Sequence, residues 1–476
     1  MTSRVAIIGG GLGGLTAAGL LARAGCDVTV FEAGHAPGGK AQLVSEGGVT
    51  LDTGPTLLTL PHLVRETFAK LGAEDLLPRF TELEEPCHYR FADGCELRAH
   101  KDVEKMAESA GELRPSERRG LRAFYAEAET IYKAAGEPYL EAPFEGMPDF
   151  MTRVARRGLS AVTLGMRMGT LDELARKHFK TDHMHQFVGR FATYAGASPY
   201  EASAAFAMIP HLERAFGVHH VEGGMGALGR ALAQAVERQG ARIKLNAKAT
   251  WSQTRQGKGF EAGPRGELER FDAVVVNADP LAAAKRTAEP LALSGYVLLL
   301  EADARLSLPH HSILFARNYR QEFEQIFSGR SPEDATLYLC HPAATDGTMA
   351  PEGKSGLFVM ANAPATGTAD APWPDAEWLR EQCLAKLDKV APGARFRVLA
   401  ERTPSDLAKQ GAPGGSIYGF LPHGKFGPFR RPRQRGEVPG LFYAGGGTHP
   451  GGGVPLVMLS GRFAAELTLA HLGRGR

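Results

Sequence analysis

Short apolar runs alternate with glycine-rich turns over the first thirty residues of the chain. Residues 4–8 (RVAII) are mostly apolar, and residues 15–24 place apolar side chains at helical spacing before Gly25. A second run with the composition of a strand covers residues 27–32 (DVTVFE). This order predicts a strand, a tight turn, a helix and a second parallel strand, the βαβ unit that begins many nucleotide-binding sheets.

Later apolar runs resemble further parts of the same sheet. The valine-rich run 272–279 is typical of a strand buried on both faces, and residues 222–240 predict a glycine turn and a helix, followed by a strand at 241–249. Residues 116–209 have a helical pattern, interrupted by prolines and glycines. The chain is therefore predicted to adopt an α/β fold. A discontinuous Rossmann-like domain would comprise residues 1–75, 216–290 and 425–476, and an inserted mixed α+β substrate domain would comprise residues 76–215 and 291–424.

The first turn contains the spacing Gly9-x-Gly11-x-x-Gly14. The N–H groups and the positive dipole end of a helix starting there can hold a pyrophosphate. Glu32, at the end of the second strand, suits a pair of ribose hydroxyls and would repel a 2′-phosphate, which argues against NADP. The alternatives are a chance turn in a chain with 58 glycines and a solvated acid at a strand end.

A second glycine-rich turn lies near the other end of the chain, before another expected helix start. Exposed N–H groups in such a turn suit a delocalised anion such as a flavin ring. One ligand shared by both ends of the chain implies FAD rather than a nicotinamide bound by one local unit. The residues of this turn expected to contact the ligand are Gly446, Gly447, Gly453 and Val454.

The loop at residues 33–40 also favours a flavin. Its glycines, Gly38 and Gly39, let the backbone pass close to a ligand, while the ammonium of Lys40 meets a phosphate or a flavin carbonyl.

Composition narrows the class of protein. A chain of 476 residues and 51.0 kDa is too long for one compact core, and 43% hydrophobic residues with a mean hydropathy of -0.20 describe a folded protein. A net charge of +2 is too small to indicate nucleic-acid binding, and the basic run 430–435 is expected to be a solvated loop. No apolar run approaches the length of about 18 residues that a spanning helix needs, so a cytoplasmic location is expected.

The cysteines and histidines show no metal-binding spacing. The five cysteines are scattered and none forms a C-x-x-C pair, so we expect reduced, mostly buried thiols and no metal. His310 and His311 are adjacent. If both lie on a strand, they are expected to face opposite sides and to be unable to bind one metal together.

Several segments, in order along nearly the whole chain, resemble bacterial carotenoid desaturases of the phytoene desaturase type, within the FAD-dependent amine oxidase and phytoene desaturase superfamily. Among these relatives the resemblance leans towards hydroxycarotenoid 3,4-desaturases. The segments are RFATYAG (190–196), SPY (198–200), HLE (211–213), GGM (223–225), PHH (309–311), GSIYG (415–419), FRRP (429–432) and GTHPG (447–451).

The resemblance implies further FAD-binding residues: Leu12, Thr56, Leu57, Ala249 and Asn277. Two of the cofactor positions depart from the family pattern. Lys40 stands where relatives more often have Arg, and Ala249 stands where they often have Val against the adenine. Neither change removes a chemical group that FAD binding requires.

The resemblance also implies a reaction in which a hydride passes to the flavin and a proton passes to a base or water. Because the resulting allylic cation is delocalised along a polyene, the protein mainly aligns substrate with cofactor and excludes water. His449 is a weak candidate for the proton acceptor, and a structural role in its turn is the alternative. Glu213 and Arg214 are weaker candidates still.

A long apolar polyene, the expected substrate, is held in the bilayer, so a peripheral membrane contact on the inner face of the cell membrane is expected. Residues 147–180 combine apolar side chains with an excess of arginine and lysine, as in helices that lie in a membrane interface. This predicts a helical membrane-facing part. The alternative is a helix pair that covers its own domain core.

Three other functions remain open from the sequence. One is a phytoene desaturase proper, and another is a flavin oxidase of the amine-oxidase type. The third is a non-enzymatic module that binds polyprenyl lipids and retains a flavin.

Overall fold

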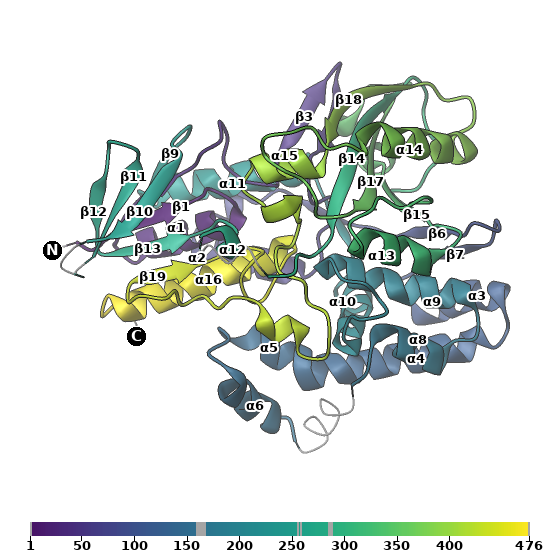
Figure 1. The fold of residues 1–476 in the computed structure, drawn as a ribbon, viewed down its shortest axis with the longest axis horizontal. Helices are drawn as coiled ribbons and strands as arrows, with labels where there is room; N and C mark the ends of the chain where they lie inside the picture. The colour runs from purple at the N-terminus through teal and green to yellow at the C-terminus, as the bar shows by residue number, and fades with distance from the viewer. Residues whose placement is uncertain (1, 159–167, 255–256, 258, 284–288, 475–476) are drawn as a thin grey trace.

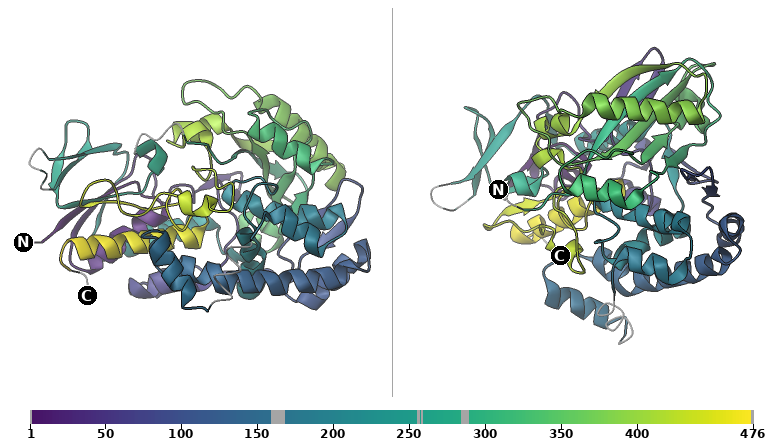
Figure 2. Two further views of the ribbon diagram at one scale, coloured as in Figure 1. Left: turned by 60° about the horizontal axis from the view of Figure 1, so that its bottom comes forward. Right: turned by 45° about the vertical axis from the view of Figure 1, so that its right-hand side comes forward.

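The structure is a computed structural model that describes residues 2–158, 168–254, 257, 259–283 and 289–474 (Figure 1). It contains a parallel sheet near both chain termini, a larger mixed sheet beside it, and a layer of helices below the mixed sheet in the view of Figure 1. The two further views in Figure 2 show the same arrangement.

The parallel sheet has the strand order β19-β13-β1-β2-β9, and every neighbouring pair in it is parallel. Segments far apart in the sequence supply its strands, as the discontinuous pattern of apolar runs implies. The strands are β1 (Arg4–Ile8), β2 (Asp27–Phe31), β9 (Arg242–Lys244), β13 (Ala273–Val276) and β19 (Leu441–Tyr443).

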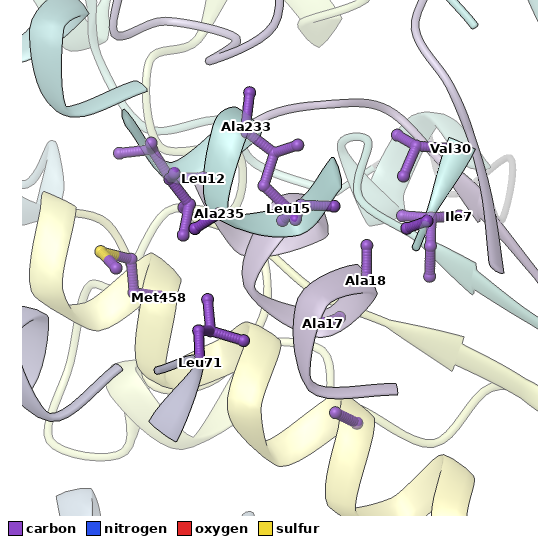
Figure 3. Close-up of a cluster of buried hydrophobic side chains, with 14 of the residues drawn as sticks. Ile7, Leu12, Leu15, Ala17, Ala18, Val30, Leu71, Ala233, Ala235 and Met458 are labelled. Carbon is purple, nitrogen blue, oxygen red and sulfur yellow. The ribbon is translucent and has the colours of Figure 1, made fainter. Parts of the chain in front are cut away.

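Three helices cover this sheet: α1 (Leu12–Arg23), α11 (Met225–Arg238) and α16 (Val454–His471). Figure 3 shows their side chains meeting in one apolar core, with Leu15, Ala235 and Met458 among them. The approach of α1 and α16 depends on glycine, because a Cβ at Gly461 would lie 2.1 Å from the carbonyl oxygen of Gly13. This contact holds the two ends of the chain together.

The mixed sheet has the order β18-β14-β17-β16-β15-β6-β7. Helix α14 (Ala376–Val390) packs on one face, and the hairpin β3 (Leu43–Glu46) and β4 (Val49–Asp52) packs on the other. The sheet strands are β6 (His88–Arg90), β7 (Glu96–Arg98), β14 (Ser294–Ala302), β15 (His311–Leu314), β16 (Leu337–Cys340), β17 (Ser355–Ala363) and β18 (Phe396–Arg402).

The helical layer shares a core with the β6–β15 side of this sheet. A buried ion pair joins Arg190 to Glu213, and the hydroxyl of Tyr194 donates to the same carboxylate. The helices are α3 (Val103–Leu113), α4 (Glu117–Ile131), α5 (Glu137–Glu141), α6 (Met147–Ala155), α8 (Leu171–His178), α9 (Asp182–Gly189) and α10 (Met208–Phe216).

The prediction of one continuous strand at 241–249 is wrong. The segment is divided, because Asn246 turns the chain with a φ of 52° between β9 and the start of β10. The other elements are a three-stranded antiparallel sheet, a strand pair, and short helices. They are β10 (Ala249–Gln253), β11 (Phe260–Pro264), β12 (Glu269–Phe271), β5 (Phe80–Glu82), β8 (His219–Val221), α2 (Pro61–Lys70), α12 (Pro280–Ala283), α13 (Tyr319–Phe327) and α15 (Pro404–Lys409).

Within the described part of the chain, no helix has both the length and the apolar character needed to cross a bilayer. The cysteines are all free, and Cys26, Cys87, Cys340 and Cys383 are buried, as expected from their spacing.

Candidate cofactor-binding site

The first glycine turn connects β1 to the start of α1. Gly9 has a φ of +101°, and a Cβ at Gly14 would lie 2.2 Å from the carbonyl oxygen of Gly9, so both positions require glycine. Gly11 is the N-cap of α1, and no side chain caps that helix end. The first N–H groups of α1 are therefore oriented to bind an anion at this end of the sheet.

Glu32 lies beside this turn at the end of β2. Its Oε2 accepts a hydrogen bond of 2.7 Å from the N–H of Gly10, and its Oε1 accepts one of 2.6 Å from the N–H of Gly34. These contacts bring the carboxylate to the edge of the glycine turn, where a ribose next to the pyrophosphate would lie. Ala249 begins β10 nearby, after a chain segment in which Ala247 donates its N–H to the carbonyl of Glu32.

Asn277, which follows β13, lies between the two glycine turns. Its Nδ2 donates to the carbonyl of Gly9 over 3.3 Å. A Cβ at Gly11 would lie 2.8 Å from that Nδ2, and a Cβ at Gly445 would lie 2.7 Å from Oδ1 of the same side chain. One amide thus fixes the spacing between the N-terminal turn and the C-terminal turn.

The C-terminal turn runs from β19 to the start of α16. Gly453 is the N-cap of α16 with a φ of +102°, and a Cβ placed there meets no described atom within 4 Å. By contrast, a Cβ at Gly447 would lie 2.5 Å from Pro280. The space beside Gly453 at the start of α16 is therefore open, whereas the space beside Gly447 is filled by protein.

Arg431 supports this turn, and sequence reasoning missed it. Its buried guanidinium donates to the carbonyls of Gly446 over 2.7 Å and of Tyr418 over 3.2 Å, and burial lowers its pKa. Tyr418 also limits Gly452, where a Cβ would lie 2.6 Å from its ring. The expectation that residues 430–435 form a solvated loop is thus wrong for Arg431. The sequence contains one indication of this role. Arg431 lies in FRRP (429–432) and Tyr418 lies in GSIYG (415–419), and both segments resemble the family.

Thr56 contacts the mixed sheet, and Lys40 contacts the loop that contains Ile417. The Lys40 Nζ is exposed and donates to the carbonyl of Ile417 over 2.7 Å. The Thr56 hydroxyl is buried and lies 2.6 Å from the hydroxyl of Tyr338 on β16. Gly39 lies close to the first glycine turn, because a Cβ added at Gly39 would lie 3.0 Å from the Cα of Gly11. Leu57 follows Thr56 and is half-buried.

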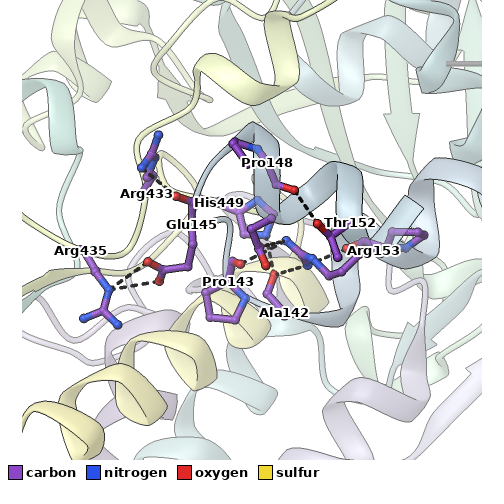
Figure 4. Close-up of polar contacts among 11 residues, drawn as sticks. Ala142, Pro143, Glu145, Pro148, Thr152, Arg153, Arg433, Arg435 and His449 are labelled. Carbon is purple, nitrogen blue, oxygen red and sulfur yellow. Dashed lines mark hydrogen bonds and ion pairs between the residues drawn. The ribbon is translucent and has the colours of Figure 1, made fainter. Parts of the chain in front are cut away.

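The structure favours the structural alternative for His449. Its Nε2 lies 3.3 Å from the carbonyl oxygen of Ala142 (Figure 4). The centroid of its ring is 4.4 Å from that of the Tyr139 ring. Because a carbonyl can only accept, the imidazole donates there. Burial lowers the pKa of His449 to about 3, so the ring is neutral at physiological pH and joins the C-terminal turn to the segment between α5 and α6.

The expected membrane-facing segment is partly buried. Figure 4 shows Arg153 turned inwards, where its guanidinium donates to the carbonyls of Pro138 and Ala142 and pairs with Asp149. Phe150 and Val154 are also buried. The prediction that residues 147–180 face the membrane is therefore wrong for Arg153. Leu159, Val162, Leu164, Met166 and Arg167, from the same expected segment, lie outside the described residues.

The expectation that His310 and His311 face opposite sides is also wrong. Strand β15 begins at His311, so the alternation of a strand does not extend to His310. The two ring centroids lie 4.5 Å apart.

FAD fits the residues that the structure brings together. The start of α1 would hold the pyrophosphate, Glu32 the adenosine ribose, and the turn before α16 the flavin ring. The glycines at these positions leave the backbone accessible, and Asn277 sets the distance between the two turns.

Replacing Glu32 with alanine is expected to weaken FAD binding by about 1–3 kcal/mol, the size of a lost charge-assisted hydrogen bond. Titration of the apoprotein with FAD, followed by fluorescence, measures the change. Asp27→Ala, at the opposite end of the same strand, is the matched control and should bind FAD as the wild type does. Equal affinity of wild type and Glu32→Ala would remove Glu32 from the site.

The comparisons with known proteins agree with this geometry. Residues 12–469 match the family described as flavin containing amine oxidoreductase. The hydroxyneurosporene desaturase of Cereibacter sphaeroides is 35% identical, with 98% of each chain covered. The zeta-carotene-forming phytoene desaturase of Myxococcus xanthus is 30% identical, covering 98% of this chain and 94% of that protein.

Solved structures show the same fold at lower identity. Cyclohexylamine oxidase from Brevibacterium oxydans superposes with a TM-score of 0.64 at 18% identity, with 100% of each chain covered. The expectations of an FAD cofactor and of a carotenoid desaturase resemblance are confirmed. With FAD as its cofactor, the chain belongs to the family of flavin-containing amine oxidoreductases.

Proposed function

We propose that the protein is an FAD-dependent carotenoid desaturase that introduces carbon–carbon double bonds into an acyclic, hydroxylated carotenoid during carotenoid biosynthesis. The observation that carries this proposal is 35% identity over nearly the whole of both chains to a hydroxyneurosporene desaturase. The paired glycine turns support it, because they form a site for an extended dinucleotide.

Bound FAD supplies a hydride acceptor for the oxidation of an allylic C–H bond. The residues of this chain contribute position and shielding. Asn277 sets the spacing of the two glycine turns, and Arg431 fixes the carbonyl of Gly446. The neutral, buried His449 joins the C-terminal turn to the helical layer. Such a site accelerates the reaction by orientation and by exclusion of water.

Expression in two carotenoid-producing hosts tests the choice of substrate. One host makes phytoene and the other makes hydroxylated acyclic carotenoids. We expect the absorption maxima of the pigments to move to longer wavelength in the second host, because each new conjugated double bond extends the chromophore. A Gly14→Val variant is the inactive control, since its side chain would collide with the carbonyl of Gly9. Extension only in the phytoene host would make the protein a phytoene desaturase, and extension in neither host would contradict the proposal.

We also propose that the protein docks peripherally on the inner face of the cell membrane through α6 and the neighbouring loop 425–430. Phe429 of this loop packs on Phe150 of α6, with ring centroids 4.7 Å apart. The side chains of Met151 and Phe426 are 37% and 58% exposed, and Arg156, which directly follows α6, is also exposed. Exposed apolar side chains beside a cation suit an interface with anionic lipid.

Flotation with vesicles tests this docking surface. The double variant Met151→Asp/Phe426→Asp should bind anionic vesicles at least about tenfold more weakly, because each buried apolar side chain contributes about 1.5–3 kcal/mol. Wild-type binding should increase with anionic lipid and decrease with salt. Trp378→Asp is the matched control, since Trp378 is 49% exposed on α14, away from α6 in Figure 1. Equal flotation of the double variant and the wild type would reject this surface.

A further inference from the structure

Three buried side chains on or directly beside two adjacent strands of the mixed sheet place potential metal ligands close together. His310, His311 and Cys340 each offer one ligand atom, and these atoms lie within 4.8 Å of one another. His311 on β15 pairs directly with Cys340 at the end of β16, and His310 immediately precedes β15. The strand pairing therefore holds the three backbones in fixed relation.

Hydrogen bonds already orient both imidazole rings. Nδ1 of His311 lies 3.0 Å from the carbonyl oxygen of Pro86, and Nδ1 of His310 lies 2.7 Å from the hydroxyl oxygen of Thr345. Because a carbonyl can only accept, Nδ1 of His311 carries the proton and Nε2 carries a lone pair. An oxygen acceptor on one ring nitrogen is the usual second contact of a metal-binding histidine.

The remaining ring nitrogens have no hydrogen-bond partner among the described residues. Nε2 of His310 and Nε2 of His311 are both buried without such a bond, although buried polar atoms are normally paired. Both side chains are more than nine-tenths buried. The thiol of Cys340 is free and equally buried.

The neighbouring residues complete a polar environment around this cluster. The ring of His220 lies 4.9 Å from the ring of His310, and its Nε2 lies 3.1 Å from a carboxylate oxygen of Asp346. Asp346 also accepts the N–H of Gly223. A negative carboxylate near the cluster favours a bound cation.

We propose that His310, His311 and Cys340 bind a borderline-soft divalent transition-metal ion of the Zn²⁺ type. Two imidazole nitrogens and one thiolate are ligands that such ions prefer. Neighbouring ligand atoms in a tetrahedral zinc site lie about 3.5 Å apart, so small side-chain rotations bring these three atoms into place. On binding, the thiol of Cys340 releases its proton to water as the metal–sulfur bond forms, and a water molecule takes the fourth position.

Zinc binding to the FAD-loaded protein tests the proposal. The protein is dialysed against limiting Zn²⁺, and bound metal is measured by elemental analysis together with flavin content. We expect one zinc per chain. Cys340→Ala and His310→Gln should each weaken binding at least about tenfold, since loss of even an outer-shell partner of a metal ligand costs about 10–100-fold. Flavin content and a cooperative thermal transition report whether each variant is folded.

Two variants serve as matched controls. Cys383→Ser changes another buried free thiol, on α14. Cys95→Ser removes a ligand from a group at the surface, Asp93, Cys95 and His183, whose ligand atoms also lie within 4.8 Å of one another. Both controls should retain one zinc per chain. The proposal is overturned if the wild type retains no zinc, if Cys340→Ala and His310→Gln both bind as the wild type does, or if Cys95→Ser abolishes binding.

Discussion

Replacing Gly453 with leucine is expected to lower the flavin content of the purified protein at least about tenfold, and desaturase activity with it. Gly453 caps α16 with a φ of +102°, and the direction of its missing side chain is open for at least 4 Å. A leucine side chain would project into this space, at the helix start that we assign to the flavin ring. A loss of about 1.4 kcal/mol already lowers affinity tenfold.

Gly473→Leu is the matched control for backbone strain. Gly473 lies just beyond the other end of α16 and has a φ of +69°, and a Cβ placed there also meets no described atom within 4 Å. Both substitutions force leucine to a positive φ, at a cost of about 1–2 kcal/mol in the left-handed region and about 1–3 kcal/mol at Gly453, where ψ is 140°. Only the Gly453 variant should lose flavin. If both variants retain flavin and full turnover, the flavin ring does not lie at this turn.

The contribution of Asp52 to stability is expected to be lost as pH rises from about 4 to 7, and Asp52→Asn is expected to remove that contribution. Burial raises the pKa of Asp52 from 3.8 to about 7, although the backbone N–H groups of Met225 and Gly226 partly offset it. Between these pH values the folded chain binds a proton that the unfolded chain has released, so stability falls with pH. The difference corresponds to at most about 4 kcal/mol.

Thermal unfolding of wild type and variant between pH 5 and 8 measures this effect. The transition temperature of Asp52→Asn should rise relative to the wild type as pH increases. Asp303→Asn is the control, because hydrogen bonds from Arg395 lower the pKa of Asp303 and its titration ends below this range. Its difference from the wild type should be constant. A constant difference for Asp52→Asn as well would show that Asp52 is ionised in the folded protein.

Local patterns predicted the start of the cofactor-binding domain well. The strand, glycine turn, helix and second strand occupy only the first 31 residues, and each follows from periodicity and the placement of glycine. Glu32 could be placed because a side chain at the end of a parallel strand lies at the same sheet edge as the preceding turn. These features depend on contacts close in the sequence.

Features that depend on distant contacts could not be predicted in the same way. Asn277 contacts Gly9 across 268 positions, and Arg431 is buried because the carbonyls of Tyr418 and Gly446 converge on it. A run of arginines gives no sign of which member is enclosed. Similarly, Arg153 faces inwards because carbonyls near the end of α5 accept its hydrogen bonds, which helical spacing does not reveal.

The proposed function depends most on the transfer of reducing equivalents from a carotenoid to the bound flavin. The direct measurement mixes the FAD-loaded protein with vesicles that contain a hydroxylated acyclic carotenoid, in the absence of oxygen. We expect the absorbance of oxidised flavin to decrease while a carotenoid with a longer chromophore forms in matching amount. A flavin that stays oxidised while the carotenoid is bound unchanged would contradict a desaturase and would favour a lipid-binding module.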